Sequence, residues 1–101
     1  MLTVIDRENF ALKEIDKEFR NSFIAKPHNE ISDAESWMLK TVGDALRKRS
    51  SEHFWNNGCY SWFINYPDEG RSVEQRIFLT ANGILVFEDC EKNKMFRVVP
   101  L

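Results

Sequence analysis

The spacing of apolar residues changes at Gly58, and this change constrains the fold more than any other feature of the chain. Before Gly58, apolar side chains recur every three or four residues, which is the period of a helix with one buried face. After it, apolar and polar residues alternate or form short runs bounded by turn residues, as is typical of strands. Helices that precede strands, rather than alternating with them, indicate an α+β fold.

The first helix is predicted over about residues 7–24. Its apolar side chains share one helical face, and they are Ala11, Leu12, Ile15, Phe19 and Phe23. Asp6 is placed to cap the N-terminus, and Pro27 ends the helix because the residue before a proline avoids the helical region. Residues 2–5 form a short apolar patch, which is either a lone strand or the lead-in to this helix.

The second helix, over about residues 34–48, has the clearer signal. Ser32 and Glu35 have the spacing of a capping box, in which each side chain accepts a hydrogen bond from the other residue's backbone N–H. The apolar stripe consists of Ala34, Trp37, Met38, Thr41, Val42, Ala45 and Leu46. Because the linker 25–32 is short, the two helices are expected to pack as an antiparallel hairpin. Residues 51–57 are compatible with a short third helix.

Four strands are expected after Gly58. They cover Cys59–Tyr66, Ser72–Thr80, Ile84–Asp89 and Met95–Val99. Asn82-Gly83 lies between two apolar runs and favours a type I′ hairpin turn. The predicted fold is therefore a single α+β domain over residues 1–101, in which an N-terminal helical hairpin packs on a four-stranded antiparallel β-meander.

Alternation along the first of these strands leaves two arrangements open. One face carries Tyr60, Trp62, Ile64 and Tyr66, and the other carries Cys59, Ser61, Phe63 and Asn65. If the helices cover the aromatic face, the opposite face is mixed and largely solvated. If they cover the other face, an aromatic band is left outside for a partner or a second copy of the chain.

Composition excludes several classes of protein. The 101 residues include 43% hydrophobic and 13% aromatic side chains, which excludes a disordered chain. No apolar run reaches the roughly 20 residues of a membrane-spanning helix. The net charge of −2, from 14 basic and 16 acidic residues, disfavours a dedicated binder of nucleic-acid backbones. The N-terminus resembles no secretory signal, so a cytoplasmic protein is expected.

No catalytic, cofactor or metal site is predicted. The two histidines, His28 and His53, and the two cysteines, Cys59 and Cys90, lack the spacings of zinc ligands. Sequence proximity of His53 and Cys59 does not establish a nucleophile and its base. The four glycines are scattered singly, so none forms a phosphate-binding loop. A protein that is not an enzyme is therefore expected.

The predicted function is to bind and block another protein. Acidic residues gather at the turns of the strand half, close to aromatic side chains, and such a surface suits a basic partner. The candidate binding residues are Tyr60, Trp62, Tyr66, Asp68, Glu69, Glu88, Asp89 and Glu91. An inhibitor, immunity protein or antitoxin directed against a basic toxin or nuclease fits this profile.

Two alternatives come from other functional classes. Arg47, Lys48 and Arg49 form a basic cluster, which with a winged-helix-like arrangement would indicate a DNA-associated regulator. The ordinary explanation of the cluster is stabilisation of a helix C-terminus. The other alternative is a structural subunit that self-associates, for example as a homodimer, through its sheet.

Overall fold

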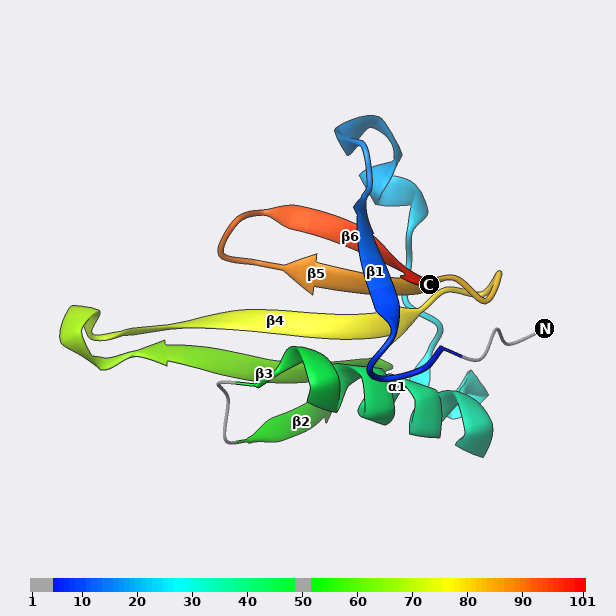
Figure 1. Ribbon diagram of the computed structural model, residues 1–101, viewed down its shortest axis with the longest axis horizontal. Helices are drawn as coiled ribbons and strands as arrows, with labels where there is room; N and C mark the ends of the chain where they lie inside the picture. Colours follow the sequence, from blue (N-terminus) through cyan, green and yellow to red (C-terminus); the bar gives the residue numbers. More distant parts are fainter. Residues whose placement is uncertain (1–4, 49–51) are drawn as a thin grey trace.

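The computed structural model describes residues 5–48 and 52–101. Within them, six antiparallel strands form one sheet in the order β1-β6-β5-β4-β3-β2, with one α-helix (Figure 1). The strands are β1 (Phe10–Glu14), β2 (His53–Asn56), β3 (Cys59–Tyr66), β4 (Arg71–Leu79), β5 (Leu85–Asp89) and β6 (Lys94–Pro100). The helix is α1 (Asp33–Leu46), and three 3₁₀ turns are η1 (Lys17–Ser22), η2 (His28–Glu30) and η3 (Pro67–Glu69). None of the described helices has the length and apolar character that crossing a bilayer requires.

The predicted helix over residues 7–24 is wrong, and with it the helical hairpin and the α+β assignment, because the fold is mostly β. Residues 10–14 form β1, which pairs with β6 from Phe10 opposite Pro100 to Glu14 opposite Phe96. Asp6 caps no helix, since its Oδ1 accepts from the backbone N–H of Glu8 at 2.9 Å. The local helical period is overridden because β6 offers β1 a ladder of backbone hydrogen bonds.

The second predicted helix is confirmed as α1, including its capping box. The Ser32 Oγ accepts from the Glu35 backbone N–H at 3.1 Å, and Glu35 Oε1 accepts from the Ser32 N–H at 2.9 Å. The Glu35 carboxylate also pairs with Lys26 Nζ at 3.2 Å, which ties the preceding segment to the helix. The predicted stripe is wrong at Trp37, because this side chain is 62% exposed while Leu39 is fully buried.

The short third helix is also wrong, because residues 53–56 form β2. A two-residue turn joins β2 to β3, with positive φ at both Asn57 (48°) and Gly58 (87°), as a type I′ turn requires. The turn at Asn82-Gly83 is not type I′, since among these two residues only Gly83 has positive φ (82°). The Gly83 N–H instead donates to the Thr80 carbonyl at 3.0 Å. The chain contains two Asn-Gly pairs, and the type I′ turn forms at the first.

The four predicted strands are confirmed as β3 to β6, with ends shifted by a residue or so. Their hairpins are unequal in length. β2 pairs with β3 only as far as Trp62, and β5 pairs with β4 only as far as Gln75. Residues 63–66 and 71–74 therefore extend past the neighbouring strands as a two-stranded arm, which points away from the sheet in Figure 1.

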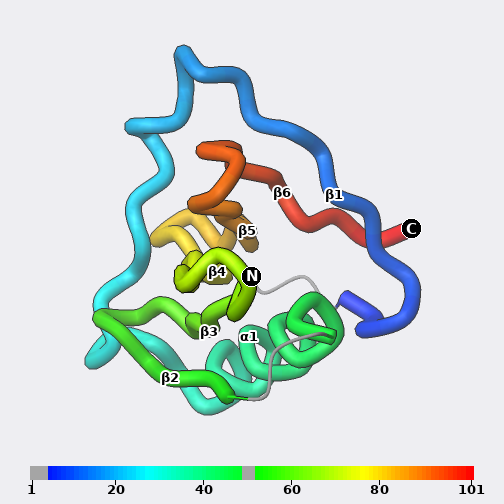
Figure 2. The backbone as a smooth tube through the Cα atoms, turned by 90° about the vertical axis from the view of Figure 1, so that its left-hand side faces the viewer, coloured from blue at the N-terminus to red at the C-terminus, as the bar shows by residue number. Residues whose placement is uncertain are grey.

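The two faces of the sheet are covered by different segments. α1 packs on one face, where Met38, Leu39 and Val42 meet Tyr60 and Trp62 in the larger core cluster. This confirms that the helix covers the aromatic face. The opposite face is not simply solvated, because residues 15–25 cross it and pack on a smaller cluster (Figure 2). That cluster consists of Cys59, Phe78, Val86 and Met95.

Candidate functional site

Two of the candidate binding residues, Tyr60 and Trp62, lie in the core. Both are fully buried, so neither is available at the surface. Trp62 Nε1 donates to Gln75 Oε1 at 2.9 Å, and the Tyr60 hydroxyl donates to Asp44 Oδ1. Arg47 Nε also donates to Asp44 Oδ1, at 2.9 Å, and to the Tyr60 hydroxyl, at 3.3 Å. The contacts among Tyr60, Asp44 and Arg47 attach α1 to the sheet, whereas the Trp62–Gln75 bond joins β3 to β4.

Burial and charge shift the pKa values of this network in opposite directions. Burial, together with the hydrogen bond to Asp44, raises the pKa of Tyr60 to about 12. Burial acts to raise the pKa of Asp44 as well, but the hydrogen bonds from Tyr60 and Arg47 outweigh it and hold that pKa below its ordinary value. Near neutral pH, the network is therefore a neutral phenol between a carboxylate and a guanidinium.

The basic cluster is only partly described. Arg47 bonds to Asp44 and Tyr60, and its side chain is 19% exposed, so it serves the attachment of α1. Lys48 is exposed at the end of the helix. Arg49 lies outside the described residues.

The remaining candidates fall into two groups. Tyr66, Asp68 and Glu69 lie toward the end of the β3–β4 arm, and Glu91, in the turn after β5, reaches Tyr66 with its side chain. Tyr66 donates its hydroxyl proton to Glu91 Oε2 at 2.8 Å, which raises the pKa of the phenol. Arg71 lies 4.5 Å from the Tyr66 ring centre and pairs with both Glu69 (2.8 Å) and Glu91 (3.4 Å). Asp68, in η3, is exposed at the tip.

Asp89 and Glu88 do not belong to this group. Asp89 is 6% exposed, and its Oδ1 accepts from the backbone N–H groups of Glu91 (3.1 Å) and Lys92 (3.3 Å), so it shapes the turn after β5. Glu88 pairs with Arg76 Nε at 2.8 Å on the sheet face opposite α1. The eight candidates are therefore divided among the core, a turn, one sheet face and the arm.

Sequence reasoning missed an aromatic pair at the base of the arm, in which Phe63 is exposed and Phe54 is half-buried. Phe63 is 43% exposed, and its ring stacks on Phe54 of β2 with the ring centres 5.3 Å apart. Alternation correctly assigned Phe63 to the face opposite Tyr60. The missing signal was β2 itself, because residues 51–57 were expected to be helical, and Phe54 therefore had no predicted cross-strand neighbour.

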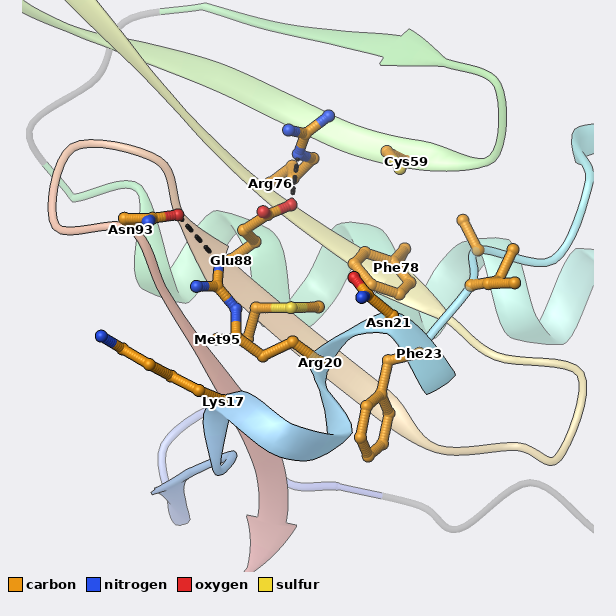
Figure 3. A pocket seen from close by; sticks show the side chains of 12 residues that line it. Lys17, Arg20, Asn21, Phe23, Cys59, Arg76, Phe78, Glu88, Asn93 and Met95 are labelled. Carbon is orange, nitrogen blue, oxygen red and sulfur yellow. Dashed lines mark hydrogen bonds and ion pairs between the residues drawn. The ribbon is translucent and has the colours of Figure 1, made fainter.

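A groove on the sheet face opposite α1 was also missed. It has a volume of about 720 Å³ and lies between the sheet and residues 17–25 (Figure 3). Phe23, Phe78 and Met95 contribute apolar surface, while Lys17 and Arg20 contribute positive charge. The sequence could not show this groove, since residues 17–24 were expected to belong to a helix packed against another helix.

The groove also contains one of the two thiols. Cys59 lines it, and burial raises the pKa of this thiol to about 11. Burial raises the pKa of Cys90 as well, and both cysteines are free. Neither is an activated nucleophile at neutral pH. Among the residues that the structure describes, no group of three or more His, Cys, Asp or Glu side chains is arranged to hold a metal ion.

Comparison with known proteins adds nothing to this geometry. No protein-family model, no curated protein and no solved structure matches this chain.

Proposed function

We propose that this chain is a non-enzymatic protein-binding domain that blocks a basic protein partner, as an inhibitor, immunity protein or antitoxin does. Its docking surface is the outer half of the β3–β4 hairpin, which we call the hairpin surface. It includes both faces of the arm: Phe63 and, from β2, Phe54 lie on the face opposite α1, and Tyr66 lies on the other face with Glu91 of the turn after β5. Asp68 and Glu69 lie at the tip.

The observation that carries the proposal is the exposed Phe63 at the start of the arm, where the β3 backbone pairs with β4 but no longer with β2. An isolated two-stranded ribbon is marginally stable in water, so nothing in the fold itself calls for an arm of this length. Aromatic side chains are enriched among the residues that dominate binding energy at protein interfaces. Phe63, already ordered by its stack on Phe54, would lose little conformational freedom on binding.

The charge of the hairpin surface indicates a basic partner. Asp68, Glu69 and Glu91 oppose the single guanidinium of Arg71, which leaves a local charge of −2. These carboxylates lie on an exposed rim, where charges mainly accelerate association and contribute little affinity. We therefore infer that the aromatic pair holds the partner and that the acidic tip attracts it.

We further infer that the domain has no catalytic role of its own and works in the cytoplasm. The raised pKa values of both thiols make them poor nucleophiles, and two free thiols suit a reducing compartment.

The test compares a hairpin variant with a matched control variant. The hairpin variant carries Phe63→Thr, Asp68→Asn and Glu69→Gln. The control carries the same three replacements on the exposed η1 region, namely Phe19→Thr, Asp16→Asn and Glu18→Gln. Each protein is immobilised and used to capture partners from a lysate of its source cells, and bound proteins are identified and quantified by mass spectrometry.

The wild type and the control are expected to retain the same basic protein, and the hairpin variant is expected to lose it. Raising the salt concentration should slow association of the purified pair, because the acidic tip acts at long range. A partner that binds all three proteins equally would refute the assignment of the hairpin surface. A partner that is acidic, or that binds at a rate independent of salt, would refute the electrostatic part.

A further inference from the structure

We propose that the groove opposite α1 is a binding site for a small amphipathic anion, a molecule with an apolar chain and a carboxylate head, such as a medium-chain fatty acid. This site is distinct from the hairpin surface and does not depend on the proposed docking function. The inference rests on the size of the groove, on the separation of apolar and charged groups along it, and on the cations at its rim.

The groove has the dimensions of a ligand site. Its volume of about 720 Å³ lies within the range of pockets that hold small molecules. Residues 17–25 run along the sheet face opposite α1 (Figure 2), and the groove is lined by side chains from this segment and from the sheet (Figure 3). The segment also leaves apolar side chains in water, since Ile24, which lines the groove, is 73% exposed.

Apolar and charged groups are separated within the groove (Figure 3). Phe23 and Phe78 lie toward one end, with Asn21 between them, and Lys17, Arg20 and Asn93 lie toward the other. Phe78 is already buried, so an apolar chain placed there would remove water mainly from the half-buried Phe23 ring and from the exposed Ile24. The same placement would bring a head group to the charged end.

The charge at that end favours an anion. The Arg20 guanidinium donates to the neutral amide oxygen of Asn93 at 2.9 Å, and no described carboxylate pairs with Arg20 or Lys17. Glu88 is the one acidic residue among the lining side chains, and its charge is opposed by Arg76 at 2.8 Å. Two cations without a carboxylate partner therefore remain beside the apolar surface, and a carboxylate head would complement them.

The test uses three probes with the same chain length and different heads. Dodecanoate, dodecanol and dodecyltrimethylammonium are titrated into the full chain below their micelle concentrations, by calorimetry and by NMR chemical-shift mapping. Dodecanoate is expected to bind with one-to-one stoichiometry, to shift resonances of residues 17–25 and Met95, and to bind about tenfold more tightly than the cationic probe.

Three variants locate the site. Lys17→Gln with Arg20→Gln should weaken dodecanoate binding about tenfold. The control pair, Lys40→Gln in α1 with Lys48→Gln just after it, should leave the affinity unchanged. Asn21→Trp places an indole in the groove from an exposed position and should abolish binding while the circular dichroism spectrum stays that of the wild type.

The inference is overturned if dodecanoate does not bind, if the cationic probe binds as tightly, or if Asn21→Trp leaves the affinity unchanged. Equal binding of dodecanol and dodecanoate would show an apolar groove without anion selectivity and would also overturn it. None of these results bears on the hairpin surface, so this inference and the proposed function fail separately.

Discussion

Gly43, in the last turn of α1, is a position where a single methyl group should strongly destabilise the fold. A Cβ atom there would lie 2.4 Å from Cδ1 and 2.6 Å from Cε1 of Tyr60, and 3.3 Å from Cγ2 of Ile77. Contacts below 3.0 Å between carbon atoms are not tolerated, so either the helix or the ring has to move. The ring is fully buried and its hydroxyl is bonded to Asp44, which leaves it little room to retreat.

The expected size of the effect follows from two opposing contributions. Replacing a helical glycine with alanine stabilises an exposed helix by about 1 kcal/mol. Overpacking a core typically costs about 1–3 kcal/mol, and two hard contacts with a ring that is held in place correspond to the upper end of that range or beyond. The net loss of unfolding free energy for Gly43→Ala is therefore about 2 kcal/mol, which lowers the Tm of a 100-residue domain by about 10 °C.

Urea and thermal unfolding followed by circular dichroism measure this loss. The matched experiment repeats the substitution in a Tyr60→Val background, where the ring atoms are absent, with all proteins in the same stabilising osmolyte. There Gly43→Ala should be neutral or stabilising, giving a coupling energy of about 2–3 kcal/mol between the two positions. A single variant at least as stable as the wild type, or one destabilised equally in both backgrounds, would refute the argument that α1 needs a glycine to approach the sheet.

Three further predictions concern other parts of the fold. Gly58→Ala combines a φ of 87° with a Cβ only 2.2 Å from the Lys26 carbonyl oxygen, so it should lower the free energy of unfolding in urea by about 3 kcal/mol or more. Gly70→Ala, with positive φ but no atom within 4 Å of the added Cβ, should lower it by only about 1 kcal/mol. Equal losses for the two variants would contradict this reasoning. The pKa of Asp44 is lowered in the folded state, so the contribution of this carboxylate to stability is present above the unfolded pKa of about 4 and is lost as pH falls through the folded pKa. Asp44→Asn should therefore flatten the decline in Tm over that acidic window. An unchanged slope of Tm against pH would count against this role of Asp44. With a pKa of about 11, only about a thousandth of Cys59 is thiolate at pH 8. Alkylation of Cys59 by iodoacetamide should therefore be about a hundredfold slower under native conditions than in urea. Equal rates would show that burial does not raise the pKa of this thiol.

The raised pKa values of the two free thiols also determine whether the stability of the fold rises or falls at alkaline pH. Because the folded state holds the protons of Cys59 and Cys90 more tightly than the unfolded chain does, stability should fall as pH rises from about 9 toward 11.

The success of sequence reasoning varied with the distance between the interacting residues. The capping box joins residues three positions apart, and α1 begins where Ser32 and Glu35 placed it. Hairpins between successive strands are also local, and β3 matches its predicted range from Cys59 to Tyr66. The candidate binding residues were predicted less accurately. Alternation assigned Tyr60 and Trp62 correctly to one face of the sheet, but it could not show whether a helix covered that face.

The helices predicted over residues 7–24 and 51–57 are wrong for the same physical reason. β1 and β2 are short strands at the edges of the sheet, with five and four residues respectively, and each carries too few residues to display a clear alternating period. Residues 10–14 even fit a helical pattern, and they become a strand because residues 96–100 provide the partner. Backbone hydrogen bonds formed across such a separation outweigh a local propensity worth a few tenths of a kcal/mol per residue.

The sequence by itself determined α1, the four successive strands and the position of their turns, because each depends on hydrogen bonds and φ preferences among neighbours in the chain. Only the tertiary structure decided that the N-terminal segment crosses the back of the sheet, that Phe63 stacks on Phe54 at the base of the arm, and that a groove lies beneath residues 17–25. These features depend on which distant segments meet. That choice is made by the free energy of the whole packed chain, and no local pattern encodes it.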